Sequence, residues 1–225
     1  MIKIKTLFSL ACTLLMLNTS FAQDKNGFGV KAGMNFNKLN IDNFDNNSTS
    51  YLDDTKNKTG FHAGIFYNFC SKRNNIVFQP GLNFIQRGTE ASYIKKDGYY
   101  TDKYDFDMTM NYLEIPLTIS YNVAKLNGTG NYFRLFVEPA ISFALSGKID
   151  NNNDESKIRF GNDLSNEDQI KPINVSLKFG ASVKINSFEP YLGYDLGLND
   201  INNSNSIYQN RGFYIGLSYH FKSIY

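Results

Sequence analysis

The chain has 225 residues, a formal net charge of +2, two cysteines and no tryptophan. The basic residues are not clustered, so nothing favours a nucleic-acid partner. No stretch beyond the N-terminal segment is apolar enough for a transmembrane helix, so strands would have to carry any membrane span.

Residues 1–22 have the pattern of an export signal. After a basic start, 7–17 is an apolar run, and Ser20-Phe21-Ala22 places small residues at the two positions that a signal peptidase reads. The run is too short for a membrane-spanning helix, which needs about 20 residues. We therefore predict cleavage after Ala22. A lipid-attached Cys12 is the alternative, but the apolar run continues past it, where a polar tether would be expected.

The mature chain, 23–225, is predicted to be a single domain that is close to electrically neutral. Removing Lys3 and Lys5 with the leader leaves 21 of the 23 basic residues against 21 acidic ones. Cys70 is then the only cysteine. One thiol forms neither an internal disulfide nor a zinc site of the usual cysteine-rich kind, so a structural role in a turn is favoured.

Eight stretches of the mature chain alternate apolar and polar side chains. In 173–185 every second residue is apolar, and this period of two indicates a strand with one apolar and one polar face. Each stretch is long enough for the roughly 9–11 residues that a tilted membrane strand needs. The predicted strands are 27–36, 59–69, 75–87, 107–121, 132–145, 173–185, 188–198 and 211–221.

The gaps between these stretches alternate between long and short. The long gaps are predicted to be polar loops at 36–59, 88–106, 146–172 and 199–210. The short gaps are predicted to be turns at 70–74, 122–130 and 186–187. Small outer-membrane barrels are connected in this way, with the long loops outside the cell and the short turns in the periplasm. The sequence therefore predicts an all-β fold, an eight-stranded antiparallel up-and-down transmembrane β-barrel.

Periodicity alone leaves open which face points inward, because a soluble lipocalin-type barrel would enclose a ligand with its apolar face. The loop alternation, the absence of tryptophan and a girdle of aromatic residues near the short turns all favour the membrane. The girdle residues are Tyr67, Phe69, Tyr121, Tyr132, Phe133, Phe188, Tyr219 and Phe221. With lipid outside, the polar faces line a narrow lumen that side chains can fill when there are eight strands.

Charged residues on the polar faces are predicted to form a structural network in this lumen. If Asn186-Ser187 is a two-residue hairpin turn, Lys184 lies opposite Glu189, Lys178 lies opposite Asp195, and a glycine pair lies between them. Opposite charges would offset the cost of burial, although solvated charges in a wet lumen are the alternative. The predicted network comprises Lys178, Asp195, Lys184, Glu189, Glu114, Arg134 and Glu138.

Four prolines fall inside the predicted strands: Pro80, Pro116, Pro139 and Pro190. Proline has no N–H group for the ladder, and a closed barrel has no edge strand to accommodate it. We therefore expect bulges or early ends of pairing at these positions.

Three segments of the mature chain resemble a family of small bacterial outer-membrane barrels. They are Tyr112-Leu113-Glu114-Ile115-Pro116-Leu117, Gly29-Val30-Lys31-Ala32-Gly33-Met34-Asn35 and Phe78-Gln79-Pro80-Gly81-Leu82. The family is catalogued as the outer-membrane protein β-barrel domain or porin family, and it includes PorT-like proteins and barrels of the OmpA and OmpX kind. The resemblance implies the eight-stranded fold, and it carries no catalytic signature. One branch of the family assists secretion, and no residue of this chain selects that branch.

The search for a metal site or a catalytic site yields no candidate that we favour. Asp150, Asn152 and Asp154 mimic the start of a calcium loop. Glu155, however, stands where glycine is needed, and Gly161 stands in the place of the closing glutamate. Ser218 and His220 share a face, yet the predicted topology places both inward at the periplasmic end, away from the outer leaflet. His62 is interpreted as a hydrogen-bonding lumen residue. We predict no catalytic residue, metal or cofactor.

Three functional classes remain open after these considerations. The first is a non-enzymatic barrel that contacts envelope or secretion proteins, or extracellular ligands, through its loops. The second is a narrow pore for small solutes, and the third is a lipid-modifying enzyme. A lumen crossed by paired charges favours the first class over the second. In each class outer-membrane lipid surrounds the chain, and the sequence does not determine the oligomeric state.

Overall fold

The computed structural model describes residues 26–42, 50–70, 75–97, 100–127, 130–151, 154–161, 170–203 and 207–221. The predicted leader, its cleavage after Ala22 and the alternative at Cys12 lie outside these residues. Among the described residues, no helix is long and apolar enough to cross a bilayer.

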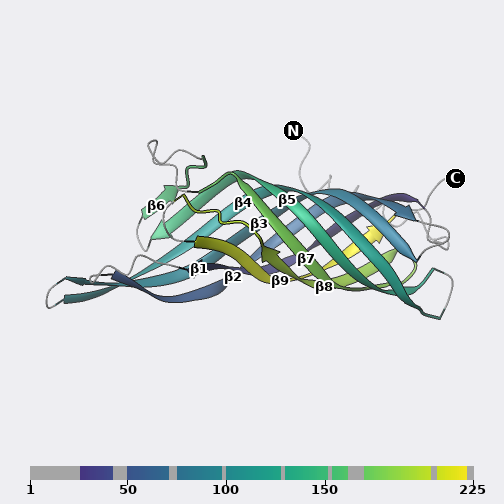
Figure 1. Ribbon diagram of the computed structural model, residues 1–225, viewed down its shortest axis with the longest axis horizontal. Helices are drawn as coiled ribbons and strands as arrows, with labels where there is room; N and C mark the ends of the chain where they lie inside the picture. The colour runs from purple at the N-terminus through teal and green to yellow at the C-terminus, as the bar shows by residue number, and fades with distance from the viewer. Residues whose placement is uncertain are drawn as a thin grey trace, which may run out of the picture.

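The described chain consists almost entirely of antiparallel strands. They are β1 (Gly27–Asp42), β2 (Ser50–Cys70), β3 (Ile76–Asp97), β4 (Tyr100–Lys125), β5 (Tyr132–Asn151), β6 (Asp154–Lys157), β7 (Ile173–Lys184), β8 (Phe188–Gly197) and β9 (Ile207–His220). Eight of them form a closed ring, because β4 pairs with β5 and β1 pairs with β9; the short β6 pairs only with β5. The predicted fold class is therefore confirmed (Figure 1).

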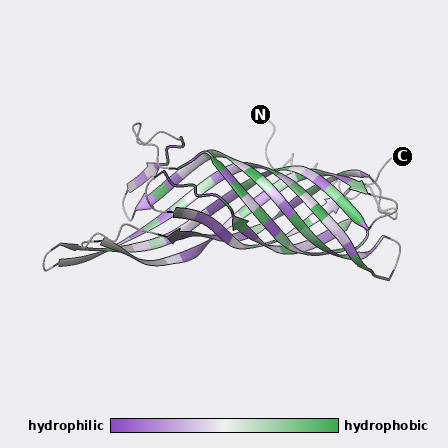
Figure 2. Cartoon of the chain, in the orientation of Figure 1, coloured by the Kyte–Doolittle hydropathy of each residue, from purple (hydrophilic) through white to green (hydrophobic). Residues whose placement is uncertain are grey.

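The barrel has its apolar side chains outside and its polar side chains inside. Phe213 and Leu192, on the outer wall, are 63% and 61% exposed, whereas Glu114 and Arg87, on the inner wall, are 0% and 1% exposed. Figure 2 shows the resulting alternation of hydrophobic and hydrophilic positions along each strand of the wall. A soluble lipocalin-type barrel would show the opposite arrangement, so that alternative is wrong.

The strands extend further at one end of the barrel than at the other. We call the end with the short turns proximal and the end with the extended strands distal. The proximal end carries the short turns and both ends of the described chain: Cys70 N donates to Asn26 Oδ1, and Phe221 N donates to the carbonyl of Phe28. At the distal end, β2, β3 and β4 extend well beyond the rest of the wall (Figure 1). The predicted alternation of short and long connections corresponds to these two ends.

The turn between β7 and β8 is the two-residue hairpin that the sequence predicts. Ile185 and Phe188 exchange both backbone hydrogen bonds, at 2.8 and 3.0 Å. Asn186 has a φ of 55°, in the left-handed region that asparagine tolerates better than most residues. Asn131 Oδ1, in the turn between β4 and β5, accepts a hydrogen bond from Asn186 N at 2.8 Å, so the two proximal turns are joined.

The predicted loop 88–106 is wrong, because β3 and β4 continue through it as a hairpin. The ladder runs without a register shift from Asn83↔Glu114 to Asp97↔Tyr100. Pairing of backbone groups needs no apolar face, and the threonines and tyrosines of this segment favour extended backbone. In the same way, β1 and β2 extend into the predicted loop 36–59, and β5 and β6 form a short hairpin within 146–172.

The four prolines interrupt pairing without shifting the register. The β3–β4 ladder skips from Pro80↔Leu117 to Asn83↔Glu114, and the register is the same on both sides of the gap. A similar gap follows Pro116↔Ala140 in the β4–β5 ladder. The expected breaks in pairing are therefore present, whereas the bulges of the β4–β5 ladder lie elsewhere, at Asn111/Tyr112 and Asn122/Ala124.

Candidate functional site: the lumen charge network

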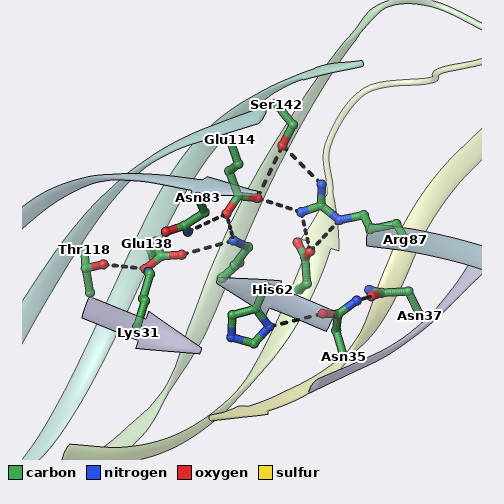
Figure 3. A network of polar contacts seen from close by, with 12 residues as sticks. Lys31, Asn35, Asn37, His62, Asn83, Arg87, Glu114, Thr118, Glu138 and Ser142 are labelled. Atoms are coloured by element: carbon green, nitrogen blue, oxygen red, sulfur yellow. Dashed lines mark hydrogen bonds and ion pairs between the residues drawn. The ribbon is translucent and has the colours of Figure 1, made fainter. Parts of the chain in front are cut away.

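Arg87 is the centre of the polar lumen. It projects inward from β3, and its Nη2 lies 2.8 Å from Glu114 Oε2 of β4 and 2.7 Å from Asp195 Oδ2 of β8. Its Nε also donates to Asp195, at 3.1 Å, and its Nη1 donates to Ser142 Oγ of β5, at 3.1 Å. The guanidinium group thus joins four strands from different parts of the wall (Figure 3).

Two lysines complete the central cluster. Lys178 Nζ of β7 lies within ion-pair distance of Glu114, and it is 3.1 Å from Glu138 Oε1 of β5. Lys31 Nζ of β1 is 3.2 Å from the second oxygen of Glu138, which also accepts a hydrogen bond from Thr118. With Arg87 and Asp195, this network contains three cations and three anions, so burial leaves no net charge uncompensated.

The backbone register around the β7–β8 turn is as expected, but the ion pairs are not. Lys178 and Asp195 are Cα partners, as are Gly180 and Gly193. The expected pairing of Lys178 with Asp195 is nevertheless wrong, because Lys178 turns to Glu114 and Glu138 while Asp195 binds Arg87. Lys178 is flanked by two acidic Cα partners, Asp195 on β8 and Glu138 on β5, and Glu114 lies on β4 beyond β5. Its ammonium group turns to the β5 side, where it forms charged hydrogen bonds with two carboxylates.

A second charged cluster lies nearer the proximal end. Glu189 of β8 accepts from Arg134 Nη1 at 2.8 Å, from His220 Nε2 at 2.7 Å and from Ser182 Oγ at 2.6 Å. The expected pairing of Glu189 with Lys184 stays a prediction beside these contacts. Lys184 is buried on the same inner face, only 3% exposed.

The histidines of the described chain are both hydrogen-bonding residues of the lumen. His62 contacts Asn35 Oδ1 at 3.1 Å and Tyr191 Oη at 2.6 Å, in agreement with its interpretation from sequence. His220 Nδ1 accepts from Asn68 at 2.8 Å, and its Nε2 is bound to Glu189. Both ring nitrogens of His220 are therefore engaged by residues other than Ser218, and the two do not form the pair that a serine hydrolase needs.

A cavity of about 50 Å³ adjoins the central cluster. Four buried polar atoms of its lining have no hydrogen-bond partner: Asn37 Nδ2, Asn83 Oδ1, Asp195 Oδ1 and Tyr214 Oη. Such atoms are normally satisfied by internal water, and this volume accommodates roughly three to five molecules. The cavity thus offers space and polar atoms for internal water beside charges that are paired.

Aromatic side chains fill much of the remaining lumen by lying over glycines. A Cβ atom on Gly193 would lie 2.7 Å from the ring of its neighbour Tyr214, and one on Gly29 would lie 2.2 Å from the ring of Phe66. Glycine is therefore needed where an aromatic ring approaches the backbone of the next strand.

An apolar cluster closes the lumen at its distal mouth. Its inward wall residues include Leu39 of β1 and Met110 of β4, both 0% exposed. The segments that follow β6 and β8 add Ile158, Ile170 and Ile201. Backbone hydrogen bonds hold these segments in place: Ile158 N donates to Gly147 O at 3.0 Å, and Lys171 N donates to Ile201 O at 2.8 Å. The polar cavity is thus capped by packed hydrocarbon.

The segment that mimics a calcium loop belongs to the hairpin of β5 and β6. Asp150 is the Cα partner of Glu155, and Glu155 lies 3.3 Å from Lys148 in an exposed ion pair. Within the described part of the chain, no group of three or more His, Cys, Asp or Glu side chains is placed to hold a metal ion.

Two members of the charge network were missed by the sequence prediction. Arg87 lies on the polar face of β3 in both the sequence pattern and the structure, and Lys31 lies on the polar face of β1, so the alternation itself was the available signal. The predicted pairs joined neighbouring strands only, whereas Arg87 reaches Asp195 of β8 and Lys31 reaches Glu138 of β5 across the lumen.

The closed ring, its lipid-compatible outer wall and its charged interior define the chain as a transmembrane β-barrel. Its residues 21–203 match the family described as outer membrane protein beta-barrel domain, and the chain belongs to that family. The resemblance noted in the sequence is thereby confirmed, and the chain is an outer-membrane barrel. Among curated proteins, none matches this sequence.

Several solved structures are similar in fold. Neisserial surface protein A (NspA) is 12% identical, with 88% of this chain and 100% of that chain covered and a TM-score of 0.46. Ail, the attachment invasion locus protein of Yersinia pestis, is 13% identical over 87% of this chain and 99% of its own, with a TM-score of 0.43. Ail in complex with the heparin analogue sucrose octasulfate is 12% identical over 88% and 99%, with a TM-score of 0.41.

Proposed function

We propose that this protein is a closed, non-enzymatic barrel that acts through contacts made outside the membrane. In this proposal the proximal turns face the periplasm and the distal end faces the cell exterior. Envelope proteins, secretion components or extracellular ligands are the candidate partners.

The observation that carries the proposal is the double closure of the lumen. Paired charges centred on Arg87 and Lys178 cross the middle of the barrel, and the apolar cluster around Met110 covers the distal mouth. An ion or sugar would have to disrupt buried ion pairs and then packed hydrocarbon to pass, and each step is costly. A narrow porin-like channel is therefore the less favoured function.

The orientation is supported by the asymmetry of the two ends. Outer-membrane barrels carry short turns on the periplasmic side and longer segments on the extracellular side. Here the β3–β4 ladder continues to Asp97↔Tyr100, whereas the pairing of β4 with β5 ends at Phe106↔Asn151. The distal extension of β2, β3 and β4 is thus the part of the chain best placed to meet a partner.

Solute efflux from liposomes tests whether the barrel is closed. The mature protein would be inserted into liposomes that contain entrapped sugars and salts of graded size. Correct insertion would be checked by flotation and by a difference in gel migration between heated and unheated samples. We expect efflux no faster than from protein-free liposomes, and no steady openings in planar bilayers. Reproducible steady channels from inserted, unheated protein would overturn the proposal in favour of a pore.

A further inference from the structure

Two basic residues face each other on the outer wall, and no acidic side chain among the described residues accompanies them. Lys38 of β1 and Arg211 of β9 are Cα partners in adjacent strands, and both occupy outward positions of the alternation. Like charges placed directly opposite one another destabilise a sheet. Their juxtaposition on β1 and β9 therefore favours an anion between them.

Neither residue has an acidic partner within the described part of the chain. Arg211 Nη2 donates to the amide oxygen of Gln209 at 3.1 Å, and its Nε is buried without a hydrogen-bond partner. No ion pair involves Lys38, which is exposed. The guanidinium group thus retains donor capacity beside a second, unengaged cation.

A second pair of basic residues provides an internal contrast. Lys148 of β5 and Lys157 of β6 are also Cα partners and are also exposed. There a carboxylate compensates the repulsion, because Glu155 lies 3.3 Å from Lys148. The positive charge of the Lys148–Lys157 pair is thus compensated by a carboxylate of the described chain, whereas that of the Lys38–Arg211 pair is not.

The position of Lys38 and Arg211 indicates the chemistry of an anion that would fit between them. On β1 the outward positions Phe28, Met34 and Phe36 are 63%, 49% and 36% exposed, and Lys38 is the next outward residue. On β9 the outward position before the 63%-exposed Phe213 is Arg211. Both cations therefore lie at the distal rim of the apolar band, at the level where lipid headgroups meet hydrocarbon.

We propose that Lys38 and Arg211 form a binding site for the phosphate of an anionic lipid headgroup in the leaflet at the distal end. The guanidinium group donates hydrogen bonds to the phosphate oxygens, the ammonium group adds a second positive charge, and the acyl chains lie along the outward aromatic residues below. This inference rests on the membrane placement that is part of the proposed function.

Native mass spectrometry of the mature protein in detergent tests the site. The probes are phosphatidylglycerol, phosphatidylcholine and inorganic phosphate, and retention of each is counted per barrel. We expect selective retention of phosphatidylglycerol, reduced roughly tenfold in K38Q/R211Q. The matched control K148Q/K157Q removes the same two charges from the other cross-strand pair and should bind like the wild type. The charge-preserving variant K38R/R211K should retain the lipid.

The possible outcomes separate this site from the function on which it rests. Equal retention by the two charge-removing variants, or equal retention of phosphatidylcholine, would overturn the site alone. Inorganic phosphate bound as tightly as the lipid would also overturn it, in favour of a soluble ion. If K38Q/R211Q folds, as judged by gel migration, and loses only phosphatidylglycerol, the site is supported. Failure of any protein to retain either lipid would count against the membrane placement itself.

Discussion

Arg87 is the residue on which the lumen network depends most, because its guanidinium group compensates two carboxylates that are themselves buried. In the variant Arg87→Met, Glu114 would keep only Lys178 as an ion-pair partner, and Asp195 would lose the ion pair with Arg87. Removing one partner of a buried pair leaves an uncompensated charge, so we expect a loss of about 3–5 kcal/mol in the free energy of unfolding. Urea titration of the lipid-embedded barrel, followed by gel migration, measures it.

Lys58→Met is the matched control for that substitution. Lys58 forms an ion pair with Asp107, but the two side chains are 18% and 42% exposed, so the loss should be under about 1 kcal/mol. The double variant Arg87→Met/Asp195→Asn should recover part of the stability, because it removes the charge that Arg87→Met leaves unpaired. Similar losses for Arg87→Met and Lys58→Met would show that the lumen charges are solvated and not paired.

The sequence was sufficient to predict which residues face inward, but it was insufficient to predict their partners. Alternation assigns Lys178, Glu138 and Asp195 to the inner face because side-chain direction repeats every two residues. Pairing depends on reach across the lumen, and the closure of the ring decides which inner faces meet. Arg87 and Asp195 are separated by 108 residues along the chain, and they meet because the closed ring places β3 and β8 on opposite sides of one lumen.

At the scale of elements, the strand ends at the proximal turns were predictable, and at the distal end only those of β7 and β8 were. The proximal ends coincide with turn residues such as Asn186, which adopts a positive φ. The distal ends carry no such signal, since β3 and β4 leave the membrane band and lose their apolar alternation while their backbone pairing continues. The apolar periodicity marks only the part of a strand that faces lipid, so it does not reveal backbone pairing that continues into water.

The distal hairpin should be dispensable for folding and required for partner contacts. Ala91 and Phe106 are Cα partners, so replacing 92–105 by Asn-Gly should close β3 and β4 with a two-residue turn and leave the wall intact. We expect unchanged heat-dependent gel migration and the loss of the crosslinked partners that the wild type captures in native membranes. The same set of partners with the shortened hairpin would place the contact surface elsewhere on the barrel.

For the whole molecule, the decisive property is an outer wall made of the side chains that a soluble protein would bury. Phe28, Ile65, Leu192 and Phe213 are all more than half exposed, and the inner face opposite them carries the ion pairs. Such a wall is stable only against the hydrocarbon of a bilayer, because exposing a continuous apolar band to water costs free energy. The same inversion explains why composition alone gives little sign of a membrane protein, since polar and apolar residues alternate in nearly equal numbers.

The depth of this wall in the bilayer can be measured with single tryptophans, because the natural chain contains none. Ala32→Trp lies midway between Phe28 and Phe36 on the outer face of β1. We expect lipids brominated near the ends of their acyl chains to quench Ala32→Trp most strongly, and lipids brominated near the headgroup to quench Phe28→Trp and Phe36→Trp most strongly. Phe136→Trp, which faces the lumen, should be quenched weakly by every lipid, provided that its gel migration shows a folded barrel. Strong quenching of Phe136→Trp together with weak quenching of Ala32→Trp would mean that the faces are assigned the wrong way round.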